Sequence, residues 1–173
     1  MKRFVTLMMS LLLTAGLLTA CGGQKDEGGA EDAQVSLNSL YAGWAEEYHW
    51  SEDAASGSPD DLLLMDLEGE TLESYYPGLA ALATEQLVAK APMMSSVVNE
   101  IVLVQCASEE DAEAAAVILQ ERADAQAEGG AWYPESMEAW SKAQVLREGT
   151  YAALIASSQY QDALVSSFQE QFA

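Results

Sequence analysis

Residues 97–106 constrain the fold of this chain more than any other segment. The middle of the segment reads Ile101-Val102-Leu103-Val104, a run of aliphatic residues that is typical of a β-strand. Because successive side chains of a strand point to opposite faces, apolar side chains lie on both faces of this one. A strand that is apolar on both faces belongs inside a sheet. The segment therefore predicts a central strand.

The hydrophobic patterns around this strand predict an α+β domain. Apolar residues recur at intervals of three and four over residues 36–49, which favours a helix there. The next predicted elements are two strands, a helix, two strands and a helix, at residues 85–92, 97–106, 108–128, 143–147, 150–157 and 160–172. This order predicts an antiparallel sheet of about four strands in a β-β-α-β-β-α core, with helices packed on it.

Local signals refine the strands. Pro92 has no amide hydrogen, so it predicts an edge position in the sheet for the strand that it ends. Glu148 and Gly149 predict a two-residue hairpin turn between the last two strands. Residues 62–67 form a short apolar run whose type the pattern leaves open.

The first 21 residues have the order of a bacterial export signal. Lys2 and Arg3 precede an apolar stretch at residues 4–18, shorter than the roughly 20 residues that a membrane span needs. Leucine, threonine and alanine stand directly before Cys21, and this arrangement resembles the lipobox of bacterial lipoproteins. The resemblance implies that residues 1–20 are removed and that the Cys21 thiol carries a diacylglyceryl group. An uncleaved signal anchor is the alternative.

This signal predicts where the rest of the chain lies and how it is organised. Residues 21–35 are rich in glycine and charge, and they predict a flexible tether. Residues 36–173 have the length of a single domain. We expect lipid on Cys21 to hold the protein at the cell membrane, on its extracytoplasmic face, without a spanning helix.

Acidic residues dominate the charge of the chain. The sequence has 28 acidic and 7 basic residues, and its formal net charge is −21. Loss of residues 1–20 removes 2 of the basic residues and leaves 153 residues with a net charge of −23. Such a chain lacks a basic patch for nucleic acid and is repelled by an anionic lipid surface. The charge either keeps the domain soluble or attracts cations and basic partners.

Three short motifs accompany the central strand, the acidic helix and the closing hairpin: Tyr75-Tyr76, Ala91-Pro92-Met93-Met94-Ser95 and Trp132-Tyr133-Pro134. Over residues 70–158 they resemble the domain of unknown function 4358. Members of that family are mostly assigned as lipoproteins of Firmicutes. The resemblance implies a fold and a location, but no activity.

No residue pattern predicts a catalytic centre, a metal site or a cofactor. His49 is the only histidine, whereas nucleophilic catalysis needs a nucleophile beside a base and zinc needs several Cys or His ligands. Cys106 shares a strand face with Val102 and Val104, which predicts a buried, inert thiol. Residues 66–70 lack the spacing of a calcium loop. A pair of carboxylates for glycoside hydrolysis stays open, because its geometry is not visible in a sequence.

Five aromatic residues are the candidate contacts with a ligand or partner: Trp132, Tyr133, Trp140, Tyr75 and Tyr76. Rings on loops can stack on sugars or grip peptides, and the same rings can staple loops onto a core. The leading hypothesis is a membrane-tethered, non-catalytic module that binds an envelope ligand or protein and no nucleic acid. The alternative is an envelope hydrolase that uses acidic residues.

Overall fold

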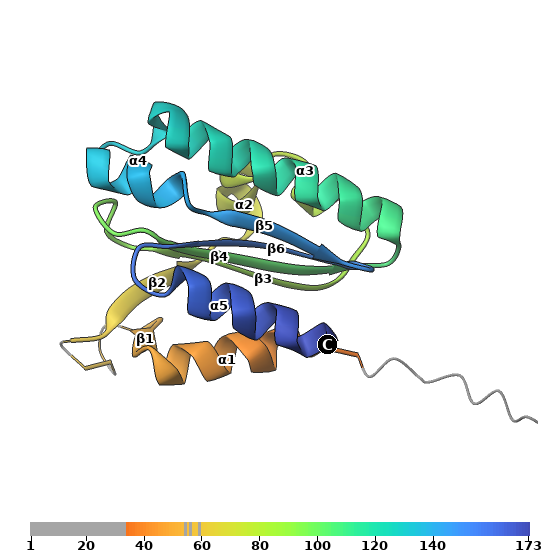
Figure 1. The fold of residues 1–173 in the computed structure, drawn as a ribbon, viewed down its shortest axis with the longest axis horizontal. Coiled ribbons are helices and arrows are strands. Elements are labelled where there is room, and N and C mark those ends of the chain that lie inside the picture. Colours follow the sequence, from red (N-terminus) through yellow and green to blue (C-terminus); the bar gives the residue numbers. More distant parts are fainter. Residues whose placement is uncertain (1–33, 54, 56, 59) are drawn as a thin grey trace, which may run out of the picture. The chain divides into compact units, whose positions relative to one another are not determined.

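Across the described residues, 34–53, 55, 57, 58 and 60–173, the computed structural model contains one six-stranded β-sheet (Figure 1). Its strands are β1 (Trp50–Ser51), β2 (Leu62–Asp66), β3 (Thr84–Pro92), β4 (Asn99–Cys106), β5 (Gln144–Glu148) and β6 (Tyr151–Ser157). Their order across the sheet is β1-β2-β3-β4-β6-β5. Every neighbouring pair is antiparallel except β1 and β2, which are parallel.

Helices cover both faces of this sheet, and they confirm the predicted α+β class (Figure 1). One face is covered by α1 (Leu37–Glu47) and α5 (Gln161–Gln169). The other face is covered by α2 (Gly69–Tyr75), α3 (Glu109–Ala125) and α4 (Pro134–Trp140). A π-helical turn, Gln126–Gly130, continues α3, and short 3-10 helices occur at Leu79–Ala81 and Glu170–Phe172.

The central strand is β4, as predicted, and all 8 of its residues are buried. Val102, Val104 and Cys106 face the core beneath α2, α3 and α4. Ile101 and Leu103 face the core beneath α1 and α5. Burying an aliphatic side chain of this size contributes about 1.5–3 kcal/mol. β4 therefore stabilises both layers at once.

The sheet extends beyond the predicted core of four strands. Residues 62–67, whose type was open, contribute β2, and β1 pairs with its outer side. The predicted edge position of β3 is wrong, because β2 pairs with the side of β3 that faces away from β4. Pro92 is tolerated because it is the last residue of β3, and the next residue, Met93, donates its amide to the Leu63 carbonyl at 3.0 Å.

The turn of the closing hairpin lies one residue later than predicted. Glu148 pairs with Tyr151, so the loop consists of Gly149 and Thr150. Gly149 has a φ of 57°. Glycine adopts this left-handed conformation without a Cβ clash, and a two-residue hairpin of type II′ places glycine at this first loop position.

Glutamine side chains bind the first described residues to the sheet. Gln86 Nε2 donates to the Val35 carbonyl at 2.8 Å, and Gln86 Oε1 accepts from the Leu37 amide at 3.0 Å. Gln34 Nε2 donates to Gln105 Oε1 at 2.9 Å. The chain therefore enters the sheet near the C-terminal end of β4.

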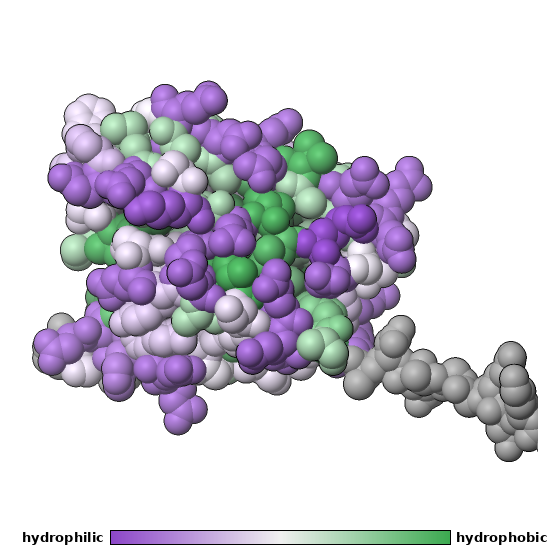
Figure 2. All heavy atoms as spheres, viewed as in Figure 1, coloured by the Kyte–Doolittle hydropathy of each residue, from purple (hydrophilic) through white to green (hydrophobic). Residues whose placement is uncertain are grey.

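The predicted signal peptide, the lipidation site Cys21 and the predicted tether up to residue 33 lie outside the described residues. Among the helices of the described part, none has the length and the hydrophobicity needed to cross a membrane. Figure 2 shows hydrophilic residues over much of the visible surface, with hydrophobic residues exposed between α3 and α5.

Candidate functional site

Arg122 and Glu100 form an ion pair near the C-terminal end of α3. Arg122 Nε donates to Glu100 Oε1 and Arg122 Nη2 donates to Glu100 Oε2, each at 2.9 Å. Glu100 is 3% exposed, and the buried hydroxyl of Tyr76 donates a further hydrogen bond to the same carboxylate. This bidentate arrangement fixes both side chains in one geometry and pairs the buried negative charge.

Three aromatic rings surround the guanidinium of Arg122. Its central carbon lies 4.4 Å from the ring centroid of Tyr75, 5.5 Å from that of Trp140 and 6.0 Å from that of Tyr76. Burial lowers the pKa of Arg122, but hydrogen bonds and attraction to Glu100 outweigh burial and raise it overall. Burial, followed by the charge of Glu100, raises the pKa of Tyr76 well above its usual value. The rings therefore already hold a cation that belongs to the protein.

The five predicted aromatic contacts lie close in the fold but differ in exposure. Trp132 is 85% exposed and, with Tyr75 and Trp140, borders a cavity of about 170 Å³ beside Arg122, here named the Arg122 cavity. Tyr133 is 44% exposed and Tyr76 is fully buried, and neither residue is part of the lining. The structure thus brings three of the five residues to one cavity.

A second cavity, of about 550 Å³, lies on the face of the sheet that carries α1 and α5, and is here named the Trp50 cavity. The rings of Tyr48 and Tyr160 stack in its wall with their centroids 4.2 Å apart. Trp50 lies beside them, with its ring centroid 5.7 Å from that of Tyr48. The remaining wall is half apolar and half polar. Its apolar residues are Leu62, Leu63, Met93, Met94, Val97 and Val98, and its polar residues are Asp60, Asp61, Asn99, Ser157, Ser158 and Gln159.

Both cavities lie at one end of the sheet, where residues 93–98 connect β3 to β4. Val97, Val98 and Asn99 border both of them. We call this part of the domain the hairpin end.

Three polar atoms of residues that line the Trp50 cavity have no hydrogen-bond partner among the described residues: Nε1 of Trp50 and Nδ2 and Oδ1 of Asn99. Trp50 is 6% exposed and Asn99 is 2% exposed. Asn99 begins β4, and strand alternation places its side chain on the face of Ile101 and Leu103, beneath α1 and α5. These atoms have almost no surface accessible to solvent, so they are buried polar groups beneath the cavity wall rather than groups exposed to a ligand within it.

The other residues considered as chemical candidates lie apart from both cavities. Cys106 is 1% exposed, and burial, followed by the charge of Asp111, raises the pKa of its thiol. Asp66 accepts a hydrogen bond from Lys90 Nζ at 2.6 Å, and Glu52 binds the same ammonium group. Among the described residues, no group of three or more His, Cys, Asp and Glu side chains could hold a metal ion.

The model of one protein family, described as a domain of unknown function (DUF4358), matches residues 58–157. The chain belongs to this family. The search of curated proteins gave no match, and neither did the search of solved structures. The matched range runs from the loop before β2 to the last residue of β6, and it confirms the resemblance found in residues 70–158.

The DUF4358 range contains the Arg122 cavity but only part of the Trp50 cavity. Arg122, Glu100 and all five predicted aromatic contacts lie within residues 58–157. Tyr48 and Trp50 precede this range, and Tyr160 follows it. The Trp50 cavity therefore forms where the layer of α1 and α5 meets the DUF4358 sheet.

Sequence reasoning did not predict Arg122, Asn99 or Trp50 as site residues. Arg122 carries a signal, because it is the single basic residue of the acidic helix α3. Asn99 carries one too, because a carboxamide at the start of an apolar central strand is costly to bury without a partner. The sequence gives no such signal for Trp50, since an aromatic residue after a helix is as common in a loop as in a binding site.

Proposed function

We propose that this protein is a lipoprotein anchored to the cell membrane through Cys21, and that residues 34–173 form a non-catalytic binding module on the extracytoplasmic side. The export signal and the lipobox-like motif support the anchor. The two cavities of the hairpin end support the binding role. The partners are membrane lipid, through the acyl chains on Cys21, and an envelope ligand or protein.

One observation carries the proposal: the cavities lie at the end of the sheet opposite to the point where the chain enters it. Gln34 binds Gln105 near the C-terminal end of β4, whereas Asn99, which borders both cavities, is the first residue of that strand. At about 3.4 Å per residue, the strand between them spans roughly 20 Å. The two cavities therefore lie at the end of the sheet away from Gln34, the first described residue.

The hairpin end also exposes large apolar side chains. Met93 and Met94 are each 60% exposed beside the Trp50 cavity, and Trp132 is 85% exposed beside the Arg122 cavity. Apolar side chains that gather at one place on a surface mark an interaction site. With its acidic charge, the module is repelled by anionic lipid, so lipidation rather than charge provides the attachment to the membrane.

The anchor is tested by expressing the full chain in a bacterial host and separating membranes from soluble protein. We expect the protein in the membrane fraction, with a mass that corresponds to cleavage before Cys21 and to lipid on the new N-terminus. The Cys21→Ala variant should lose the lipid and be misprocessed or released. An uncleaved Cys21 without lipid in the native protein would overturn the proposed anchor.

The binding role is tested in the same membranes by chemical cross-linking. A variant with Met93→Ser and Trp132→Ser should lose the cross-linked partner that the native protein captures. Val117→Ser is the matched control, because Val117 is 54% exposed on α3 and belongs to neither cavity. Turnover of a cell-wall or peptide substrate by the purified protein, lost when one carboxylate is replaced, would contradict a non-catalytic role.

A further inference from the structure

We propose that the outer edge of β5 is a dimer interface, at which the β5 strands of two copies of this chain pair antiparallel and continue the sheet from one copy into the other. The inference goes beyond the proposed function, because it uses neither cavity and does not depend on what the module binds.

Two residues of β5 direct their main-chain groups away from the sheet. The Thr150 carbonyl accepts an amide hydrogen from the last residue of β4, so the next residue, Tyr151, turns its N–H and C=O groups toward β5. Tyr151 therefore forms a hydrogen-bonded pair with Glu148. Alternation along β5 then directs the N–H and C=O groups of Val145 and Arg147 outward. β5 is the last strand of the sheet, and no described strand pairs with its outer side.

The two edges of the sheet differ in how well they are protected from another strand. β1, at one edge, has 2 residues, and so short a strand offers little to pair with. β5, at the other edge, has 5 residues, pairs with β6 without a bulge and contains neither proline nor lysine. A regular edge strand of this length is a template for pairing with another chain.

Hydrophobic surface lies along the same edge. Val145 and Leu146 are each half-buried, and they pack against the two different helix layers. Figure 2 shows hydrophobic residues exposed between α3 and α5, and Figure 1 shows β5 running between these helices. A partner strand therefore covers apolar surface as well as pairing the main-chain groups.

The sequence of β5 is complementary to itself in one antiparallel register. Pairing centred on Leu146 places the Leu146 side chains of the two copies beside each other. It joins Val145 of each copy to Arg147 of the other by main-chain hydrogen bonds, which are the groups that point outward. It also places Gln144 of each copy opposite Glu148 of the other, where the carboxamide can donate to the carboxylate.

The two neighbouring symmetric registers are less favourable. Pairing centred on Val145 would use the main chain of Ala143, whose amide already donates to the Trp140 carbonyl at 3.0 Å. Pairing centred on Arg147 would place two guanidinium groups directly opposite each other, and like charges in that position are destabilising. The register centred on Leu146 avoids both costs.

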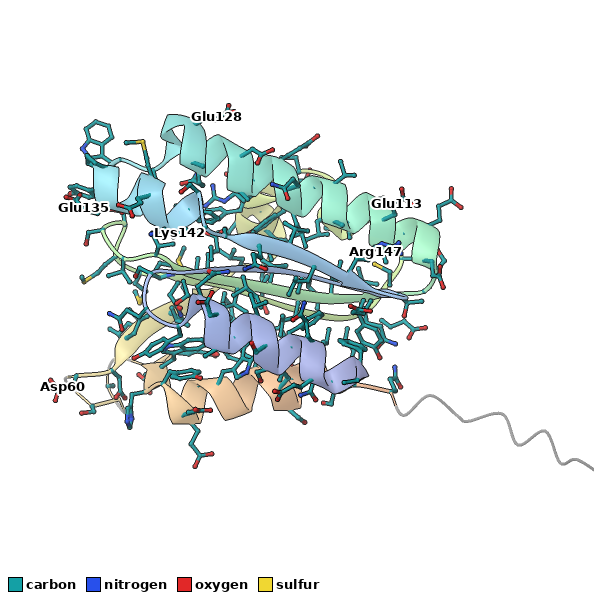
Figure 3. All side chains as sticks on the ribbon, in the orientation of Figure 1. Asp60, Glu113, Glu128, Glu135, Lys142 and Arg147 are labelled. Atoms are coloured by element: carbon teal, nitrogen blue, oxygen red, sulfur yellow. The ribbon has the colours of Figure 1, made fainter. Side chains whose placement is uncertain are left out.

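Charge also favours a second copy at this edge. Of the lysines and arginines among the described residues, Lys90 and Arg122 are mostly buried in ion pairs. The other two, Lys142 and Arg147, are exposed, and Figure 3 shows them near β5. In the proposed register Glu148 lies diagonally across from Lys142 of the other copy, a separation of roughly 7–8 Å. The edge therefore brings opposite charges together in a chain whose net charge of −21 otherwise repels its copies.

Single cysteines test the register in the full-length protein in membranes. Leu146→Cys should form a disulfide-linked dimer on a non-reducing gel, because opposite residues of a non-hydrogen-bonded pair have Cα atoms about 4.5 Å apart. Gln144→Cys and Glu148→Cys should each stay monomeric alone and cross-link when the two variants are co-expressed. These two are matched controls, because both residues are exposed on the same face of β5 as Leu146. The native chain, in which Cys106 is buried, gives the background.

The Arg147→Pro variant separates dimerisation from folding. The Arg147 side chain is exposed and its N–H points outward, so proline removes an intermolecular donor and leaves the pairing with β6 in place. Sedimentation equilibrium of the full-length protein in density-matched detergent should show association weakened about tenfold or more, with cooperative urea unfolding retained. Arg147→Ala removes the same side chain but keeps the N–H, so it should associate like the native protein.

A native protein that stays monomeric at every concentration up to about 100 μM would overturn the inference. So would a dimer that Arg147→Pro leaves intact. If Leu146→Cys forms a disulfide with a different membrane protein and not with itself, the edge takes a foreign strand and the second copy is the wrong occupant. The proposed function is tested separately, by the cross-links that depend on Met93 and Trp132, so either proposal can fail while the other stands.

Discussion

The carboxylate of Glu100 is buried, and its charge depends on two neighbouring side chains. Arg122 gives it two hydrogen bonds and a full positive charge, and Tyr76 gives it a third hydrogen bond. Arg122→Leu removes the charge and leaves the carboxylate with Tyr76 alone. Breaking a buried pair on one side costs about 3–5 kcal/mol. We expect a loss of that size in the free energy of unfolding, measured with urea.

The double variant Glu100→Gln, Arg122→Leu should recover most of this loss. Glutamine still offers an oxygen to Tyr76, and no uncompensated charge remains in the interior. Lys142→Ala is the control, because the Lys142–Glu138 pair is exposed and should leave the unfolding transition unchanged. A double variant as unstable as Arg122→Leu would mean that the cost is lost packing rather than an unpaired charge.

At the scale of single residues, the sequence predicts which side chains are buried better than it predicts which side chains pair with each other. Alternation along one strand was enough to place Cys106 on the face of Val102 and Val104. The pairing of Arg122 with Glu100 joins residues 22 positions apart. It depends on how α3 lies across β4, and no local pattern records that. The unpaired atoms of Asn99 are equally invisible, since the sequence does not show what surrounds a side chain.

The start of α1 depends on a side chain from β3. Gln86 Oε1 accepts from the Leu37 amide, one of the donors at a helix start that have no partner within the helix. Gln86 Nε2 donates to the carbonyl of Val35. Gln86→Leu leaves both backbone groups without these bonds, so we expect a loss of about 1–3 kcal/mol in the free energy of unfolding. Hydrogen exchange at the Leu37 amide should accelerate.

Gln144→Leu serves as the control for this change. Gln144 is exposed on β5, so the same substitution there should alter neither stability nor exchange at Leu37. Unchanged exchange at Leu37 in Gln86→Leu would contradict the idea that β3 docks the start of α1.

At the scale of elements, local patterns predicted which segments form strands and helices but not all of their neighbours. Pro92 predicts an edge position for β3, and the pattern of residues 62–67 does not identify the strand that pairs there. β1 has 2 residues, too few for any periodicity, and it exists because β2 offers it a free side. Strand pairing depends on contacts between residues remote in sequence, which a local reading does not contain.

The whole molecule needs two helix layers, because its sheet is apolar on both faces. The layer of α2, α3 and α4 lies within residues 58–157, whereas α1 and α5 lie outside this range on either side. The face that α1 and α5 cover carries Leu64, Val88, Ile101, Leu103, Ala153 and Ile155. The family match therefore covers a sheet with one helix layer. The second helix layer consists of α1, which precedes the matched range, and α5, which follows it.

Cutting the chain to residues 58–157 tests whether the fold requires this second layer. Each large aliphatic side chain that loses its cover forfeits about 1.5–3 kcal/mol, and several of them together exceed the 5–15 kcal/mol by which a domain is stable. We expect this fragment to aggregate, to bind a hydrophobic dye and to unfold without a cooperative transition. Residues 34–173 should unfold in one cooperative step.

Adding back residues 158–173 alone restores the buried Leu164 and Phe168 but not α1, so that fragment should stay less stable than 34–173. A monomeric 58–157 fragment that unfolds cooperatively would mean that β2 to β6 with one helix layer suffice, and that α1 and α5 serve the Trp50 cavity rather than the fold.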